Sequence, residues 1–364
     1  EIVLTLGRFS LSHLSYVVGQ ALCSRAGRAL KIENERTLQS GLFFGRWALG
    51  IALFSVFCAM LAGPQNLLVA RFSDAKAGGF DGLTQQMLFI ARSTSLLAMV
   101  IMLYIARFWP VERLRRHSLI MALVFLPLFL IINYPPALAR FALLGTLIAI
   151  GCLFVDFKSP VVKLQMSLAS VFLMIFVFPI LKLISREGVG FSDFIAAVGR
   201  ADTSVMFLNV DFDAFMQTAS TIQYLSSDVG DLRWGMNFLG VALFFVPRGI
   251  WPGKPIDTGE IVSVGLGYWF NNVASPLPAE ALMGFGLLGP ILVFGLLGFF
   301  VMYIERSVSR TALPSFVLYA ILMGFIVIIL RGALNGVAPQ FASAFFAFGT
   351  MMIAWRYRIV WRTV

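Results

Sequence analysis

Long, uninterrupted runs of apolar residues recur along the chain. Eight of these runs approach the roughly 20 residues that a helix needs to cross the core of a bilayer. They lie at about residues 41–62, 88–106, 118–133, 138–155, 164–184, 283–303, 314–332 and 341–355. Residues 2–22 form a ninth candidate, weakened by Arg8 and His13, for which a helix lying in the membrane interface is the alternative. Because the runs are continuous and lack a period of two, they predict α-helices and disfavour an outer-membrane barrel.

The composition indicates a membrane environment. Of the 364 residues, 59% are hydrophobic and only 13% are charged, whereas soluble domains carry about 25% charged residues. So few charged residues could not cover the surface of a soluble protein. Most of the surface of this protein therefore has to face lipid. The sequence therefore predicts an all-α polytopic membrane protein with about eight to ten transmembrane helices. We expect residues 1–364 to form a single integral membrane domain.

The positive charges indicate how the helices are oriented. The formal net charge is +10, but many of the cations stand in short clusters beside apolar runs, which signals membrane topology and not nucleic-acid binding. Five basic segments alternate with the helices, at residues 23–40, 107–117, 156–163, 304–313 and 356–362. All five can lie on the cytoplasmic side, so the remaining connections are expected to face outward.

One outward-facing connection, residues 185–282, is much longer than the others. It holds ten of the 18 acidic residues of the chain and only five cations. A short apolar stretch near residues 236–247 interrupts it, and this stretch is too short to cross a bilayer, so we expect a re-entrant or interfacial segment. A large polar loop in a protein made otherwise of helices and tight turns is where function is expected to concentrate.

The strongest candidate site in this region is the segment Val246-Pro-Arg-Gly-Ile-Trp-Pro-Gly-Lys-Pro255. Its prolines and glycines forbid a helix and favour a rigid, sharply turned backbone. Arg248 and Lys254 stand on this frame with Trp251 between them, an arrangement that suits an anionic ligand at the membrane surface. The alternative is a loop that only anchors the protein in the interface, with Arg and Lys side chains reaching the headgroups.

Glu280 and a set of glycines follow at the start of the next apolar run. Gly284-Phe-Gly-Leu-Leu-Gly289 matches a dinucleotide-binding fingerprint, but no strand precedes it, so we interpret the glycines as sites of close helix packing. Glu280 is an unusual acid at the outer edge of a membrane helix and is a candidate general base. A charge that merely stabilises a helix N-terminus is the alternative.

Two arginines are predicted where membrane helices meet the outer face. Arg140 follows a tight turn that begins at Asn133, and Arg331 precedes a glycine. Charged groups at such positions face a cavity or the interior of the bundle, or else extend to the outer headgroups. Arg46 and Arg92 also lie inside apolar runs, but they rank lower because no turn frames them.

The sequence provides little support for metal or nucleotide chemistry. Asp211 and Asp213 have the spacing of a metal-binding Asp-x-Asp pair, which is common by chance. His13 and His117 have no partner for a metal site or a triad, and no phosphate-binding loop is present, which disfavours ATP hydrolysis. No metal or cofactor is therefore predicted.

The proline-rich segment and its surroundings resemble the O-antigen polymerases of the Wzy type, also called oligosaccharide repeat unit polymerases. The resemblance rests on Pro247, Arg248, Trp251, Pro252, Lys254 and Pro255, on Glu280, and on the Phe285-Gly-x-x-Gly289 start of a helix. The turn between Asn133 and Arg140 and the long outer loop fit the same layout. Gly249 stands where this family is expected to have Ser or Thr.

The resemblance implies an all-helical membrane glycosyltransferase of the bacterial inner membrane, similar in layout to O-antigen ligases and other type C glycosyltransferases. Such an enzyme polymerises undecaprenyl diphosphate-linked oligosaccharides, which serve as donor and acceptor, on the periplasmic face; a chain-length regulator protein is a further candidate partner. Arg248 and Lys254, together with Arg140, Arg331 and Trp251, would bind the departing diphosphate. Glu280, and after it Asp211 or Asp213, would act as the base in an inverting reaction.

Two other functions remain open from the sequence. An O-antigen ligase would use the same lipid diphosphate donor but transfer the glycan to a lipid A core sugar. A transporter of lipid-linked glycans would be expected to show internal repeats and broken helices near the midplane. The sequence shows no such repeat, and its unusual polar residues gather toward one face, which favours an enzyme of the outer face.

Overall fold

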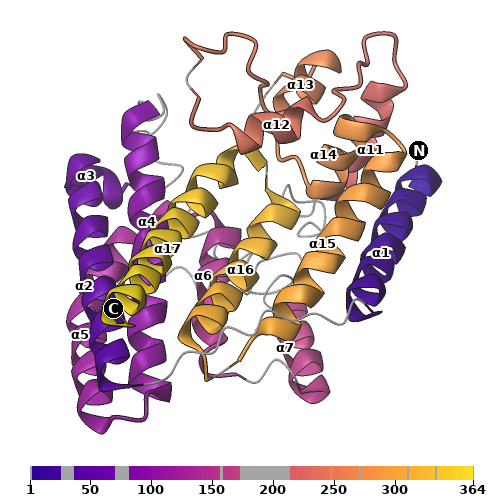
Figure 1. Ribbon diagram of the computed structural model, residues 1–364. Helices are drawn as coiled ribbons and strands as arrows, with labels where there is room; N and C mark the ends of the chain where they lie inside the picture. Colours follow the sequence, from indigo (N-terminus) through magenta and orange to yellow (C-terminus); the bar gives the residue numbers. More distant parts are fainter. Residues whose placement is uncertain are drawn as a thin grey trace, which may run out of the picture. The chain divides into compact units, whose positions relative to one another are not determined.

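The computed structural model describes the chain apart from residues 1, 26–36, 70–81, 156–158, 173–213, 247, 270–272, 310, 333 and 364 (Figure 1). The part of the chain that it describes contains helices and no strands, which confirms the all-α prediction. Among the described residues, seven helices are long and apolar enough to cross a membrane: α1 Ile2–Arg25, α2 Leu38–Leu61, α4 Gly82–Phe108, α5 Glu112–Ile132, α15 Leu288–Ser307, α16 Leu313–Arg331 and α17 Leu334–Thr363. The protein is therefore a multi-pass membrane protein, and residues 2–22 belong to a helix of membrane-spanning length.

Shorter helices connect the long ones. They are α3 Pro64–Leu67, the 3-10 helix η2 Pro135–Ala137, α6 Arg140–Gly151, α7 Pro160–Phe172, α11 Ala214–Leu225, α12 Met236–Ala242, α13 Thr258–Gly265 and α14 Leu277–Phe285. The apolar run 138–155 was expected to cross the membrane, but α6 has only 12 residues. At 1.5 Å per residue it extends about 18 Å, well short of the roughly 30 Å of hydrocarbon.

The expected helix over residues 283–303 is instead two helices. α14 ends at Phe285, and Gly286 follows with a φ of +57°, a conformation that favours glycine and that stops the helix. α15 begins two residues later, and a side chain at Gly289 would overlap the carbonyl oxygen of Ala281. The glycines thus allow the two helices to pack closely at this break, as the sequence predicts.

The chain divides into two compact units. The first consists of Glu1–Glu35, Asp213–Tyr319 and Phe325–Ala342, and the second of Arg36–Phe212, Ala320–Gly324 and Ser343–Val364. Each unit is described here by itself.

In the first unit, α1 and α15 run side by side in the same direction. Gly19 lies against the backbone of Gly295, and Gly298 lies against the backbone of Tyr16, so the two helices approach through small residues. Arg306, in the last turn of α15, donates hydrogen bonds to the carbonyl oxygens of Cys23 (3.0 Å) and Ser24 (2.8 Å) at the end of α1. The two helices therefore end together, with cations at that end.

The four short helices of this unit gather at the opposite end. Figure 1 shows α11, α12, α13 and α14 near the ends at which α1 and α15 begin. α14 leads directly into α15, and α11 packs against both α1 and α14. Glu280 of α14 and the basic residues Arg25 and Arg306 are thus at opposite ends of the α1–α15 pair.

In the second unit, α4 packs between α2 and α5 and is the most buried of the spanning helices. On α4, Ser95 accepts a hydrogen bond from the Asn133 side chain at 2.8 Å. The Asn133 side chain also donates to the carbonyl oxygen of Phe129 at 3.1 Å. These bonds fix the end of α5 and the start of the turn that follows it.

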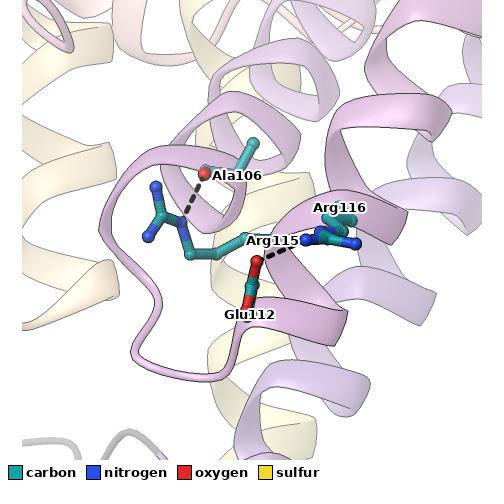
Figure 2. Close-up of polar contacts among 4 residues, drawn as sticks. All are labelled: Ala106, Glu112, Arg115 and Arg116. Carbon is teal, nitrogen blue, oxygen red and sulfur yellow. Dashed lines mark hydrogen bonds and ion pairs between the residues drawn. The ribbon is translucent and has the colours of Figure 1, made fainter.

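The turn between α4 and α5 carries the basic cluster predicted at residues 107–117. Figure 2 shows that Arg115 donates to the carbonyl oxygen of Ala106 at 3.2 Å, and that Arg116 pairs with Glu112 at 2.6 Å. Both side chains of this Arg116–Glu112 pair are largely exposed. An exposed pair one helical turn apart contributes only about 0.3–0.5 kcal/mol, so this cluster is essentially a set of solvated cations.

Candidate functional site

The candidate site is built around the short helix α14. Prolines at positions 276 and 278 start the helix, and every residue from Leu277 to Gly284 is buried. A helix that is buried all round normally carries apolar residues on every face. Glu280 is the exception, because its carboxyl group is charged when ionised yet only 2% of the residue is exposed. A buried acid of this kind needs hydrogen-bond donors around it.

The donors come from two other segments of the chain. Oε2 of Glu280 accepts hydrogen bonds from the side-chain amide of Asn237 in α12 at 2.8 Å and from the hydroxyl of Thr258 in α13 at 2.7 Å. The same Asn237 amide donates to the backbone carbonyl of Glu280 at 3.0 Å. One carboxylate oxygen therefore joins α12, α13 and α14.

Burial raises the pKa of Glu280 from 4.5 to about 7. Removal of water from the carboxylate is the main cause; the bonds from Thr258 and Asn237 oppose it, and the negative charge of Asp257 adds to it. The buried hydroxyl of Ser275 lowers the pKa slightly, although it forms no hydrogen bond of normal geometry with any described residue. Near neutral pH, Glu280 is thus close to half protonated.

This raised pKa predicts a pH-dependent cost to stability. A carboxyl group that binds its proton more tightly in the folded than in the unfolded protein loses stability as the pH rises from about 4.5 through about 7. Above pH 7 the cost is about 3 kcal/mol, from 1.36 kcal/mol per pKa unit. We expect Glu280→Gln to raise the thermal midpoint at pH 8 and to change it little at pH 5.

The measurement is thermal unfolding of the purified protein at both pH values. Asp228→Asn is the matched control, because it makes the same chemical change at an exposed position of the same region. An equal shift of the midpoint at pH 5 and pH 8 in Glu280→Gln would contradict the predicted burial cost.

Residues 243–257, which we call the cation loop, connect α12 to α13. Arg248 donates from its guanidinium to the carbonyl oxygens of Lys254 at 2.7 Å and Pro255 at 3.4 Å. Lys254 donates from Nζ to the carbonyl oxygens of Phe244 at 2.6 Å and Val246 at 3.0 Å. The two cations thus tie the loop to itself, which agrees with the rigid frame expected from its prolines and glycines.

The two cations lie close to each other without a compensating acid. Partial burial and the neighbouring charge of Arg248 both lower the pKa of Lys254. Neither cation takes part in an ion pair with any residue that the structure describes. Arg248 is exposed, and three of the five N–H groups of its guanidinium are left after its two backbone bonds. Two adjacent unneutralised cations attract an anion.

The backbone of the cation loop is anchored near Glu280. Trp251, which is half-buried, accepts a bond from the Lys254 amide at 3.0 Å and closes a turn between the two cations. The ring of Pro255 packs against Gly240 of α12, where a β-carbon would lie 3.3 Å from it. Thr258 is the fourth residue after Lys254, so their Cα atoms are at most about 14 Å apart. The cation pair and the buried carboxyl therefore belong to one region of the first unit.

Asp257 is a functional candidate that the sequence did not single out. Its Oδ1 accepts the amide of Gly259 at 3.1 Å, so that it caps α13, and the residue is partly exposed. Burial raises its pKa, the bond from Gly259 lowers it, and the charge of Glu260 raises it further. An Asp before Thr-Gly-Glu is typical of an ordinary helix N-cap, so nothing in the sequence points to the electrostatic effect of Asp257 on Glu280.

The other predicted site residues belong to other helices or lie outside the described residues. Arg331 ends α16, whereas Arg140 begins α6 in the other unit. The side chain of Arg140 and both Asp211 and Asp213 lie outside the described residues. Their roles at the site remain predictions.

Arg92 lies on α4, inside the apolar run in which the sequence has it. Its Nε lies 3.4 Å from the carbonyl oxygen of Ile132, at the end of α5 just before the Asn133 turn. Arg92 therefore reaches the last residue of α5, just before that turn. Its buried Nη2 has no hydrogen-bond partner among the described residues.

Comparison of the chain with family models, curated proteins and solved structures finds no match. Among the described residues, no three His, Cys, Asp or Glu side chains gather closely enough to hold a metal ion. The chemical argument therefore depends on the cation loop and on the carboxyl groups of Asp257 and Glu280. Together they form a candidate anion site with acids nearby, at one end of a membrane-embedded unit.

Proposed function

We propose that the protein is a membrane glycosyltransferase that polymerises undecaprenyl diphosphate-linked oligosaccharide repeat units into a surface polysaccharide. One observation carries the proposal: Arg248 donates a hydrogen bond to the backbone of Lys254, and neither cation has an acidic partner among the described residues, on a loop of a multi-pass membrane protein. A lipid diphosphate is an anion presented at the membrane surface. Its leaving group would develop negative charge during glycosyl transfer, and fixed cations stabilise such charge.

The orientation of the site supports a reaction on the outer face of the bacterial inner membrane. Arg25 and Arg306 lie at the end of the α1–α15 pair opposite to α14. Basic residues mark the cytoplasmic side of membrane helices. The cation loop would then face the periplasm, where undecaprenyl diphosphate-linked repeat units would meet it.

The proposed reaction is a single displacement. A hydroxyl of the acceptor sugar attacks the anomeric carbon of the donor, the bond from that carbon to the diphosphate oxygen breaks, and the bonding electrons leave with the diphosphate. Arg248 and Lys254 bind the departing diphosphate. Direct attack inverts the anomeric centre.

A base has to take the proton of the attacking hydroxyl, and we assign this role to Asp257. Glu280, which the sequence favours, is almost fully buried, and its Oε2 already accepts two hydrogen bonds. Asp257 is partly exposed, and only its Oδ1 is used in capping α13. Its raised pKa makes it a better proton acceptor than an ordinary aspartate.

The test supplies the purified full chain in lipid with the undecaprenyl diphosphate-linked repeat unit of its host and separates the products by length. A ladder of multiples of the repeat unit is the expected result. A single transfer, seen only after lipid A core is added, would identify a ligase. No transfer in either assay, together with movement of the lipid-linked unit across the bilayer, would identify a transporter.

A further inference from the structure

We propose that Glu280 and Thr258 are positioning residues that hold the cation loop in its anion-binding conformation. The inference rests on the proposed function, because it takes the ligand of Arg248 and Lys254 to be a prenyl diphosphate. It assigns to Glu280 a role that differs from that of a catalytic base. The basis is the pattern of hydrogen bonds around a single carboxylate oxygen.

That oxygen connects both flanks of the cation loop. Asn237 belongs to the helix that precedes the loop, and Thr258 is the residue that directly follows it. Both donate to Oε2 of Glu280. The helix that precedes the loop and the residue that follows it are therefore fastened to the same point on α14.

α14 is a suitable fixed support for the loop. All of its residues up to Gly284 are buried, and its carbonyl groups at Met283 and Gly284 accept the backbone amides of Arg233 (2.9 Å) and Gly235 (2.8 Å). These bonds place the start of α12 on α14 independently of Glu280. The carboxyl group adds the connection to the far side of the loop, through Thr258.

The fastening reaches the cations through the backbone. Arg248 binds the carbonyl oxygens of Lys254 and Pro255, which lie four and three residues before Thr258. Lys254 in turn binds the carbonyl oxygens of Phe244 and Val246, on the side of the loop that follows α12. Each cation is thus bonded to a backbone segment that leads to one of the two residues that donate to Glu280. The hydrogen bonds to Glu280 therefore help to fix the position of both cations.

Such a support is needed because the two cations repel each other. Like charges held close together destabilise a loop unless other contacts offset the repulsion. The hydrogen bonds to Glu280 offset this repulsion. The two cations are therefore held in place to bind a ligand with two or more negative charges. Preorganised donors of this kind bind an anion without the cost of ordering the loop.

The experiment measures binding of farnesyl diphosphate to the full chain in lipid nanodiscs. Thr258→Val removes the hydroxyl while keeping the shape of the side chain, and we expect it to weaken binding about ten- to a hundredfold. Thr258→Ser restores the hydroxyl and should recover most of the affinity. Glu280→Ala should weaken binding like Thr258→Val. In the polymerisation assay, Thr258→Val should raise the KM for the donor more than it lowers kcat.

Ser263→Ala is the matched control. Ser263 is also buried on α13, but its hydroxyl donates to the carbonyl oxygen of Glu260 and does not reach Glu280. Equal weakening by Thr258→Val and Ser263→Ala would mean general destabilisation and would overturn the inference. Unchanged binding in Thr258→Val would overturn it while leaving the proposed function intact. Failure of the wild-type chain to bind farnesyl diphosphate would overturn both.

Discussion

Arg248→Ala should abolish chain growth while the protein still accumulates in the membrane. The guanidinium is exposed, and its two bonds go to loop carbonyls, so its loss opens no cavity in the core. What is lost is a charged donor to the departing diphosphate, and removal of one such donor lowers kcat about 10²- to 10³-fold. The measurement is the length distribution of polymer made from the lipid-linked repeat unit by equal amounts of the two proteins.

Arg116→Ala is the matched control for this variant. It also removes an exposed arginine, but one that pairs with Glu112 in the turn between α4 and α5 (Figure 2). We expect it to leave polymer length and amount unchanged. Arg248→Lys keeps the charge but loses the forked geometry of the guanidinium, so its activity should lie between those of wild type and Arg248→Ala. Normal polymer from Arg248→Ala would remove the cation loop from the mechanism.

The fold was largely predictable because the apolar runs are long. A window of about 20 apolar residues has one low-cost structure in a bilayer, and α2, α4, α5 and α16 follow their predicted runs closely. The run 283–303 was wrongly predicted to be one helix, because hydropathy carries no information about backbone conformation. Gly286, with its positive φ, is as apolar as its neighbours but ends α14.

The candidate site was predictable only in part. Arg248, Lys254 and their proline-rich frame are local in the sequence, and the structure confirms a non-helical loop that its own side chains hold together. The hydrogen-bond partners of Glu280 are distant in the sequence, because Asn237 and Thr258 lie 43 and 22 residues away along the chain. Only packing brings them to one carboxylate oxygen. Asn237 did carry a signal, as a polar amide inside an otherwise apolar stretch.

Asp257→Asn should reduce chain growth about 10²- to 10⁴-fold while leaving farnesyl diphosphate binding unchanged. Asn is as good a helix cap as Asp, so α13 should keep its N-terminal hydrogen bond to Gly259 and the protein should remain folded. The amide cannot accept a proton from the sugar hydroxyl. The loss should therefore fall on kcat, unlike the loss expected for Thr258→Val.

Glu260→Gln is the matched control for Asp257→Asn, since it removes one negative charge from the same turn of α13. It should change activity only severalfold, through its charge effect on Asp257. If Asp257→Asn instead retains more than about a tenth of wild-type activity, the proton acceptor is a different group. A loss of activity in Asp211→Asn or Asp213→Asn would then identify that residue as the proton acceptor. A Glu280→Gln variant that is inactive but still binds the diphosphate would identify Glu280 as the proton acceptor. A comparison of diphosphate binding with kcat in each variant thus distinguishes the carboxyl group that accepts the proton from the carboxyl group that holds the cation loop.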